Sequence, residues 1–197
     1  MHRTFVLSHY QTEPLLAARR AGEGEAETSV DLGRMSVRLQ LTDAGVALPD
    51  GSTLTWETIA EINDVAQNCF AIHDGEATPI RAFSEVTGRL ASLMPTSRAP
   101  TLVLAGIPMH RIKDVDPLED TRNKMRAIGA LRGRVLDTST GLGYTAIEAA
   151  RTASQVITIE IDPAVLEVAR QNPWSEGLWS RENTRQVVGD SFEEVAR

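Results

Sequence analysis

The stretch that most constrains the fold covers residues 133–162, GRVLDTSTGLGYTAIEAARTASQVITIEID. It contains two short β-type runs, and each of them ends on an acid, Asp137 or Glu160. Between them lie a loop of small residues and a helix-forming run rich in alanine, isoleucine and glutamate. This order predicts a strand–loop–helix–strand unit, in which the carboxyl ends of parallel strands meet at a site for a nucleotide-like ligand.

The loop before the helix has the residue types that a closely bound ligand requires. Gly141 and Gly143 let the backbone turn tightly and approach a ligand with no side chain in the way. The helix, expected over residues 144–153, directs its N–H groups and positive dipole end toward whatever lies over the loop. The carboxylate of Glu160 is placed to accept hydrogen bonds from the hydroxyls of a ribose.

This loop differs from the loops that bind phosphates. It has neither the G-x-G-x-x-G pattern nor a final Gly-Lys-Ser/Thr, and Asp137 would repel a pyrophosphate. A carboxylate at this point suits a cationic ligand instead. A nicotinamide-dependent dehydrogenase is therefore disfavoured. The plain alternative is a βαβ turn without a ligand, although two acids and two glycines occur together in the order that a site requires.

These residues together resemble the cofactor half of a Rossmann-type S-adenosylmethionine-dependent methyltransferase. The resemblance implies an enzyme whose cofactor is S-adenosylmethionine. The methionine part would lie against Asp137 and residues 139–143. The ribose would bind Glu160, and the adenine would pack on Ile161 and present its amino group to Asp190, which ends the later run RQVVGD. The cofactor-binding residues implied in this way are Asp137, Thr138, Ser139, Thr140, Gly141, Gly143, Tyr144, Glu160, Ile161, Asp190 and Ser191.

One loop position departs from the family pattern, because Ser139 stands where the first glycine is expected. A serine fits there if its φ stays negative. The wider chain, residues 93–125 with the β-rich part before them, is similar to a group of predicted methyltransferases that are distantly similar to spermidine synthases. Spermidine synthases also place a small β-domain before a Rossmann domain. Two alternatives to methyl transfer follow: aminopropyl transfer, and a non-catalytic cofactor-binding or scaffold fragment.

The composition limits the class of protein further. Of the 197 residues, 42% are hydrophobic and 24% charged, which is ordinary for a soluble globular chain. The net charge of −7 argues against a broad nucleic-acid-binding face and leaves room for a local basic patch. Cys69 is alone and the four histidines show no ligand spacing, so neither a disulfide framework nor a metal site is expected. With no bilayer-spanning run and no signal peptide at its start, the chain is expected to be cytoplasmic, without a membrane partner.

Residues 1–100 are expected to form a small β-rich domain with mixed α+β structure. Strands are expected over residues 4–8, 30–32, 36–41, 46–48, 69–73 and 78–84, and helices over residues 13–20 and 54–65, the latter capped by Thr53 or Thr55. Residues 22–28 read as a polar, acidic loop. Residues 87–100 contain glycine and two prolines and are expected to be a boundary region without regular structure.

Residues 101–197 are expected to form an S-adenosylmethionine-binding, Rossmann-like α/β domain. A strand over residues 101–105 and a helix over 118–131 precede the cofactor unit, and a helix over 164–171 follows it. The family sheet has seven strands, and only the first three have counterparts here, so a truncated or shared domain is expected. The family motif that usually touches the transferred methyl is on the fourth strand. No catalytic residue is therefore assigned, and the acceptor, a small molecule or another substrate, stays open.

Two further expectations come from the same comparison with methyltransferases. The helix before the first strand commonly lies across the cofactor site, which makes residues 109–111 and 120–121 candidates to line the pocket. The alternative is that His110 and Arg111 pair with acids downstream of them. The first strand would be an open apolar edge of the sheet, which predicts a homo-oligomer or another partner that covers it.

Overall fold

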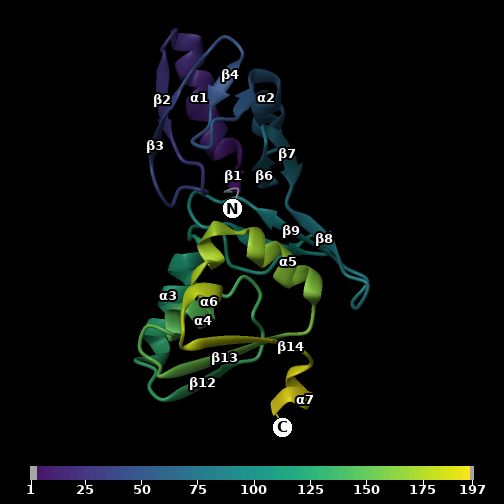
Figure 1. Ribbon diagram of the computed structural model, residues 1–197. Coiled ribbons are helices and arrows are strands. Elements are labelled where there is room, and N and C mark those ends of the chain that lie inside the picture. The colour runs from purple at the N-terminus through teal and green to yellow at the C-terminus, as the bar shows by residue number, and fades with distance from the viewer. Residues whose placement is uncertain (1–3, 196–197) are drawn as a thin grey trace. The chain divides into compact units, whose positions relative to one another are not determined.

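The computed structural model describes residues 4–195, and Figure 1 shows their helices and strands. Both halves of the chain mix helices with β-strands, so the fold is of the mixed α/β class. The chain divides into two units between Ile80 and Arg81. This division falls before the boundary expected near residue 100, because strands on both sides of residue 100 belong to one sheet. That the two units are separate functional domains stays a prediction.

The first unit contains two helices and three small sheets. Its helices are α1 (His9–Ala21) and α2 (Trp56–Asp64). One sheet, in the order β1–β6–β7, is formed by β1 (Phe5–Leu7), β6 (Phe70–His73) and β7 (Glu76–Pro79). Two antiparallel pairs are formed by β2 (Glu25–Thr28) with β3 (Val37–Gln40), and by β4 (Gly45–Ala47) with β5 (Thr53–Thr55). Side chains from helices and strands, among them Phe5, Leu15, Leu54 and Ile59, share one buried core.

Both helices of this unit begin at side-chain caps. Thr55 accepts a hydrogen bond from the amide of Thr58 at 3.2 Å, which confirms one of the two caps expected for α2. Helix α1 begins earlier than expected, because the Oε1 atom of Gln11 accepts hydrogen bonds from the amide and the hydroxyl of Ser8, at 3.0 and 2.7 Å. A serine followed three residues later by glutamine is a recognised start signal that the sequence contained.

Two expectations for residues 22–32 are wrong. Residues 30–32 do not form a strand, whereas most of the expected loop at residues 22–28 forms β2. Acidic residues suggest a loop, but in β2 they alternate with the buried Ala26 and occupy the exposed face. Arg38 of β3 pairs with Glu25 across the two strands at 3.0 Å, and such pairs stabilise neighbouring strands.

The second unit contains two larger sheets. The antiparallel one, in the order β11–β10–β9–β8, is formed by β8 (Arg81–Phe83), β9 (Leu90–Met94), β10 (Thr101–Leu104) and β11 (Ile107–Pro108). The expectation that residues 87–100 lack regular structure is therefore wrong. Glycine and proline residues flank β9 without interrupting it, and its alternate residues Ala91 and Leu93 are buried.

The second sheet of this unit is parallel, in the order β12–β13–β14. Its strands are β12 (Arg134–Asp137), β13 (Gln155–Glu160) and β14 (Thr184–Val188). The helices of the unit are α3 (Pro117–Ile128), α4 (Tyr144–Ala149), α5 (Pro163–Gln171), a 3-10 turn η1 (Pro173–Ser175), α6 (Gly177–Ser180) and α7 (Ser191–Val195). Helix α4 is shorter than expected, since it ends at Ala149.

Helices cover one face of the parallel sheet and separate it from the antiparallel one. Helices α3 and α4 pack together, and α4 also contacts β12, β13 and α6 (Figure 1). Ala146, Ala149, Val156 and Leu178 form the buried cluster between them. Helix α5 lies against β8 and β9 on one side and β13 on the other. This packing holds the carboxyl ends of three parallel strands at one edge of the sheet.

The described residues leave the first strand of the parallel sheet at an edge. Within residues 4–195, β12 pairs with β13 alone, and Leu136 on β12 is 46% exposed. A partner that covers this edge stays a prediction. Over the same range, the helices are all too short or too polar to cross a bilayer.

Candidate functional site

The loop between β12 and α4 depends on the conformational freedom of two glycines. Gly141 and Gly143 have φ angles of 53° and 77°, in the left-handed region that other residues rarely adopt. A Cβ added at Gly143 would lie 2.9 Å from Cδ2 of Leu178, whereas one added at Gly141 would meet nothing within 4 Å. Ser139 keeps its φ outside the positive range, which satisfies the condition for a serine at that position.

A chain of side-chain hydrogen bonds joins the loop to the two strands below it. Strand register places Asp137 opposite Thr158, whose hydroxyl donates to Oδ2 of Asp137 at 2.9 Å. The hydroxyl of Thr140 lies 2.8 Å from that of Thr158. Because Thr158 has a single hydroxyl proton, Thr140 is the donor in this second bond. The donor and the acceptor of both hydrogen bonds are therefore fixed.

The carboxyl group of Asp137 lies partly buried at the mouth of the loop. Burial raises its pKa above the ordinary value, and hydrogen bonds from the Thr158 hydroxyl and the Ser139 amide act against that rise. The hydrogen bonds to Asp137 from the described residues thus offset only part of the cost of burying its charge. A cationic group beside it would stabilise the charged carboxylate.

Glu160 connects the end of β13 to the same loop. Its buried carboxylate accepts the amide of Gly141 on Oε2 at 2.9 Å and the amide of Asp162 on Oε1 at 3.1 Å. A carboxylate has about four lone-pair sites, so two bonds leave it able to accept hydroxyl protons. Ile161, the next residue, is 49% exposed and offers an apolar surface beside the carboxylate.

The third strand brings Asp190 to the same edge. The amide of Gly189 donates to the backbone carbonyl of Glu160 at 2.9 Å, which places the end of β14 beside the end of β13. Oδ1 of Asp190 accepts the amide of Phe192 at 2.9 Å, at the start of α7. Ser191 is the first residue of that helix, and Thr138 is exposed on the loop.

Tyr144 differs from the other predicted site residues, because its side chain is buried in the core. Its hydroxyl donates to the carbonyl of Pro100 at 2.9 Å and accepts from Nδ2 of Asn172 at 3.0 Å. These bonds tie the first residue of α4 to two distant segments. The structure therefore brings together Asp137, the loop and Glu160, and it gives the Tyr144 ring a position inside the fold. Its part in cofactor binding stays a prediction.

His110 lies against α4 through the ring of Tyr144, with 5.2 Å between the ring centroids. Its Nδ1 atom is 3.0 Å from the hydroxyl of Thr101. Burial, together with the charge of Lys124, lowers the pKa of His110 to about 4, although the charge of Asp120 acts to raise it. His110 is thus a neutral, packed side chain at pH 7.

The expected pairing of His110 and Arg111 with downstream acids is wrong: no such ion pair forms within residues 4–195. Asp116 instead caps α3, where Oδ1 accepts the amides of Leu118 and Glu119 at 2.9 and 3.3 Å. Asp120 pairs with Lys124 on the same helix at 2.6 Å. Asp116 and Asp120 are thus engaged within α3, and neither forms an ion pair with His110.

Asp162 stabilises the segment that follows Glu160, and the sequence reasoning did not find it. Its buried carboxylate accepts the hydroxyl of Thr87 at 2.7 Å and the amide of Ala164 at 2.9 Å. Burial acts to raise its pKa, but the hydrogen bonds, including one from Ser84, outweigh burial and hold the pKa below the ordinary value. An aspartate directly before Pro163 signals a helix cap, but no local pattern connects it with Thr87.

Among residues 4–195, no group of side chains is suited to bind a metal ion. Across residues 4–195, histidine, cysteine, aspartate and glutamate side chains do not gather in any group of three that could hold an ion. The polar groups at the strand ends instead suit an organic ligand. Their two carboxylates, beside a loop whose glycine amides already donate to Glu160 and to the carbonyl of Thr140, fit a ligand that has a positive charge and hydroxyl groups.

Comparison with known sequences gives one informative relative. No protein-family model matches the chain. The uncharacterized protein MJ1233 of Methanocaldococcus jannaschii is 39% identical over 150 residues, which cover 76% of this chain and 50% of that protein. The chain thus spans about half the length of the curated relative that it matches.

Solved structures give partial similarities. Spermidine synthase from Thermotoga maritima aligns with a TM-score of 0.46 and 18% identity over 58% of this chain and 40% of its own. Spermidine synthase in complex with the transition-state analogue AdoDATO gives 0.43 and 15%, over 59% and 43%. Wild-type Trm5b from Pyrococcus abyssi gives 0.35 and 18%, over 70% and 41%. Similarities at these TM-scores do not establish a function for this chain.

Proposed function

We propose that this chain binds S-adenosylmethionine over the loop between β12 and α4 and belongs to a methyltransferase. One observation carries the proposal. The carboxyls of Asp137 and Glu160, at the ends of neighbouring parallel strands, flank a loop in which Gly141 and Gly143 are left-handed. In this proposal β12–β14 are the first half of a Rossmann-like methyltransferase sheet, and the unit beginning at Arg81 is the cofactor domain.

Each residue has a role that follows from its surroundings. Asp137, whose pKa burial raises, would gain a cationic partner in the amino group or sulfonium of the ligand. Glu160 would accept the ribose hydroxyls with the lone pairs that Gly141 and Asp162 leave unused. The exposed side chain of Ile161 would pack on the adenine, and Asp190 would accept its amino group.

S-adenosylmethionine supplies an activated methyl group on its sulfonium. The chain's own contribution would be to hold that ligand in one orientation and to surround it with fixed polar groups. We assign no catalytic residue and no methyl acceptor. A cytoplasmic location, and a homo-oligomer or partner that covers β12, belong to the same proposal.

Calorimetric titration with S-adenosylhomocysteine tests the assignment. Wild-type protein should bind in the micromolar range, and Asp137→Asn and Glu160→Gln should each weaken binding by about tenfold or more, since each removes charge-assisted hydrogen bonds. The matched control is Glu167→Gln, an exposed residue of α5 that should leave binding unchanged. Circular dichroism would establish that each variant is folded.

Two outcomes would overturn the proposal. One is tight binding of NAD in place of S-adenosylhomocysteine. The other is S-adenosylhomocysteine binding that neither Asp137→Asn nor Glu160→Gln weakens. Decarboxylated S-adenosylmethionine serves as a further arm, because preference for it over the parent compound would favour aminopropyl transfer.

A further inference from the structure

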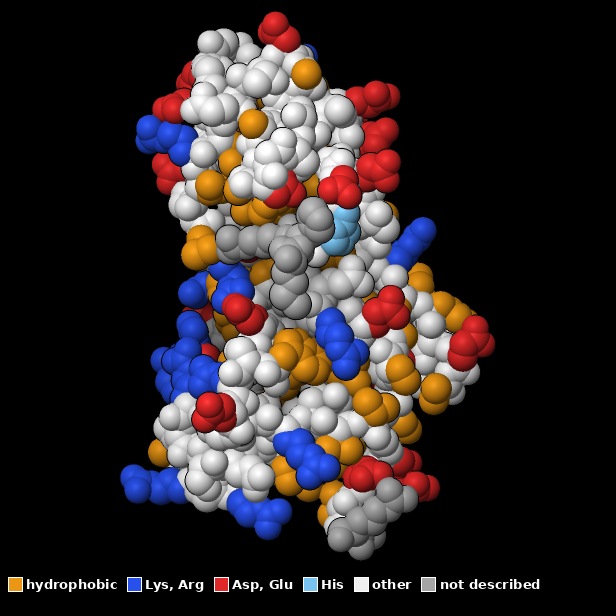
Figure 2. All heavy atoms as spheres, in the orientation of Figure 1, with side chains coloured by type: hydrophobic (Ala, Val, Ile, Leu, Met, Phe, Trp, Pro, Cys, Tyr) orange, Lys and Arg blue, Asp and Glu red, His pale blue; other side chains and the backbone are white. Residues whose placement is uncertain are grey.

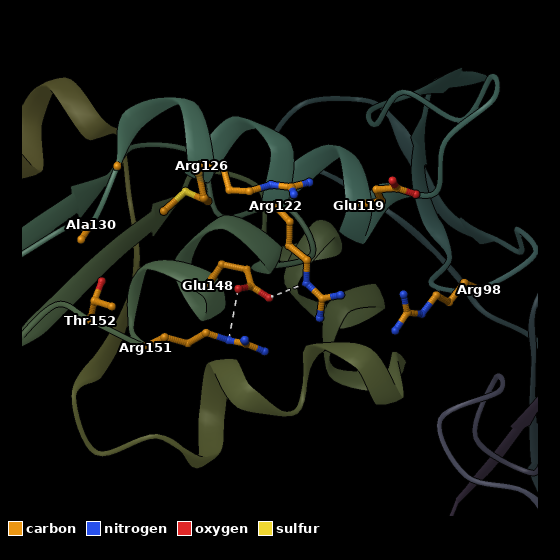
Figure 3. Close-up of a pocket in the computed structure, with 10 residues that line it drawn as sticks. Arg98, Glu119, Arg122, Arg126, Ala130, Glu148, Arg151 and Thr152 are labelled. Atoms are coloured by element: carbon orange, nitrogen blue, oxygen red, sulfur yellow. Dashed lines mark hydrogen bonds and ion pairs between the residues drawn. The ribbon is translucent and has the colours of Figure 1, made fainter.

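A second pocket, of about 840 Å³, lies between α3 and α4 and shares no residue with the proposed cofactor site. Figure 3 shows its arginine side chains around one space. Two of them, Arg122 and Arg126, come from α3, and Arg151 follows α4. The fourth, Arg98, precedes β10. Arginines far apart in the sequence are thus brought to one place by the packing of α3 on α4.

The pocket is positive although the chain is acidic. Its lining contains four arginines against two glutamates, Glu119 and Glu148, which leaves two positive charges without a counter-charge in the lining. The whole chain has a net charge of −7. On the face drawn in Figure 2, Lys and Arg side chains gather over α3. The lining of this pocket thus has a local excess of positive charge in a chain that is acidic overall.

Glu148 orients two of these arginines. Its side chain is only 10% exposed, and its Oε1 and Oε2 atoms contact Nε of Arg122 at 3.2 Å and Nε of Arg151 at 3.1 Å. One carboxylate can balance one of the two guanidinium charges. Both contacts use Nε, so the terminal nitrogens of each guanidinium keep N–H groups for a ligand. The side chains of Arg122 and Arg151 are 37% and 54% exposed, so a ligand can reach them.

Arg98 faces these two arginines from the other side of the space (Figure 3). Its guanidinium lies 5.7 Å from the ring centroid of Trp174, a contact that limits its freedom. Along the α3 wall, Arg126 donates to Asn123 on the same helix. Three segments thus present guanidinium groups that are already partly oriented before any ligand arrives.

We propose that this pocket binds a phosphate ester, with Arg98, Arg122 and Arg151 donating to its phosphate oxygens. Planar guanidinium groups match phosphate oxygens in pairs, and a phosphate offers more acceptor oxygens and more charge than a carboxylate. The volume is of the size that holds a whole organic ligand, and Met125, Gly129 and Ala130 add an uncharged wall for the remainder of the ester. The ester comes either from a free nucleotide or from a nucleic-acid strand.

Binding of three probes at low and moderate salt tests this proposal: inorganic pyrophosphate, ADP and a labelled single-stranded RNA. Wild-type protein should bind at least one of them, and Arg98→Gln and Arg151→Gln should each weaken binding by about tenfold or more. The matched control Arg20→Gln, at an exposed position of α1, should leave binding unchanged. Binding of RNA with a steep salt dependence identifies the strand as the source, and binding of ADP without RNA identifies the nucleotide.

Three outcomes would overturn the proposal. They are no binding of any phosphate probe by folded protein at low salt, binding that Arg98→Gln and Arg151→Gln leave intact, and equally tight arginine-dependent binding of oligoglutamate. Arg98 forms no ion pair within residues 4–195, so its substitution is the variant least expected to disturb folding. The same variant should bind S-adenosylhomocysteine like wild type, which separates this proposal from the one for the cofactor.

Discussion

His110 should make the stability of the protein depend on pH in a range where an exposed histidine would not. In the folded protein its pKa is about 4, against an ordinary value of 6.5, because the ring is partly buried beside Tyr144 and lies near Lys124. Unfolding restores the ordinary pKa, so between these two values the unfolded chain binds a proton that the folded chain does not. Stability must therefore fall as the pH drops from 6.5 toward 4.

The size of this effect follows from the separation of the two pKa values. Each unit of pKa difference corresponds to about 1.4 kcal/mol of unfolding free energy. At pH 4.5, about two units below the pKa of the unfolded chain, about two units of this difference have taken effect. His110 should thus cost wild-type protein roughly 2 to 3 kcal/mol of unfolding free energy between pH 7 and pH 4.5. Carboxyl groups that titrate over the same range contribute equally to wild type and to a His110 variant, so they cancel in a comparison.

The assay is urea denaturation of wild type and His110→Gln at both pH values. The variant should lose less stability on acidification than wild type, by roughly 2 to 3 kcal/mol. The control His73→Gln, an exposed position, should behave like wild type. Equal pH dependence in wild type and His110→Gln would refute the account of a partly buried, neutral histidine.

Three further outcomes are expected from the contacts around the site. Gly141→Ala should lower the unfolding free energy by ~1 to 2 kcal/mol, the cost of a positive φ alone. Gly143→Ala should lower it by more, because a Cβ at position 143 would also meet the side chain of Leu178. Urea denaturation of the two variants checks this, and equal losses would contradict it. Tyr144→Phe should cost about 1 to 3 kcal/mol in the same assay, since it removes the hydroxyl that donates to the Pro100 carbonyl and accepts from Asn172; a neutral result would contradict that reading. The pKa of Asp162 is lowered in the folded protein, so its contribution to stability is present above the ordinary pKa of 3.8 and is lost as the pH falls through the folded pKa. Thr87→Val removes one of the hydrogen bonds that lower this pKa and should reduce the loss of stability in acid. An acid unfolding transition unchanged from wild type would count against this.

The parallel unit was predictable because its signals are local. Strand β12 ends at Asp137 and β13 at Glu160, and the glycines between them mark a turn with positive φ angles. Parallel pairing of neighbouring strands then follows, because a single helix connects them. The structure adds what the pattern could not contain, namely the bonds from Thr158 to Asp137 and from Gly141 to Glu160.

Errors arose where tertiary contacts override local composition. The acidic run of β2 resembles a loop until β3 pairs with it and Arg38 forms an ion pair with Glu25. The glycine and prolines near β9 suggest a linker until β8 and β10 pair with it. His110 stands among charged residues in the sequence, yet burial against Tyr144 determines its state.

The arginine pocket was also beyond sequence reasoning. Its residues occur at positions 98, 122, 126 and 151, a spacing that has no meaning until α3 packs on α4. The net charge of −7 argues only against a broad basic face, and it says nothing about four arginines in one place. Local charge is a property of the packing and is visible only when the fold is known.

The most direct test of the central claim is to locate S-adenosylhomocysteine on the protein by NMR. On titration of nitrogen-15-labelled protein, the account predicts that the largest backbone amide shifts occur at Gly141, Gly143 and Ile161 and saturate with one binding constant. The chemical shifts of the backbone amides around Arg98 should not change. Saturable binding that leaves the Gly141 and Ile161 amides unmoved and shifts a different region would contradict the assignment of the cofactor to this loop.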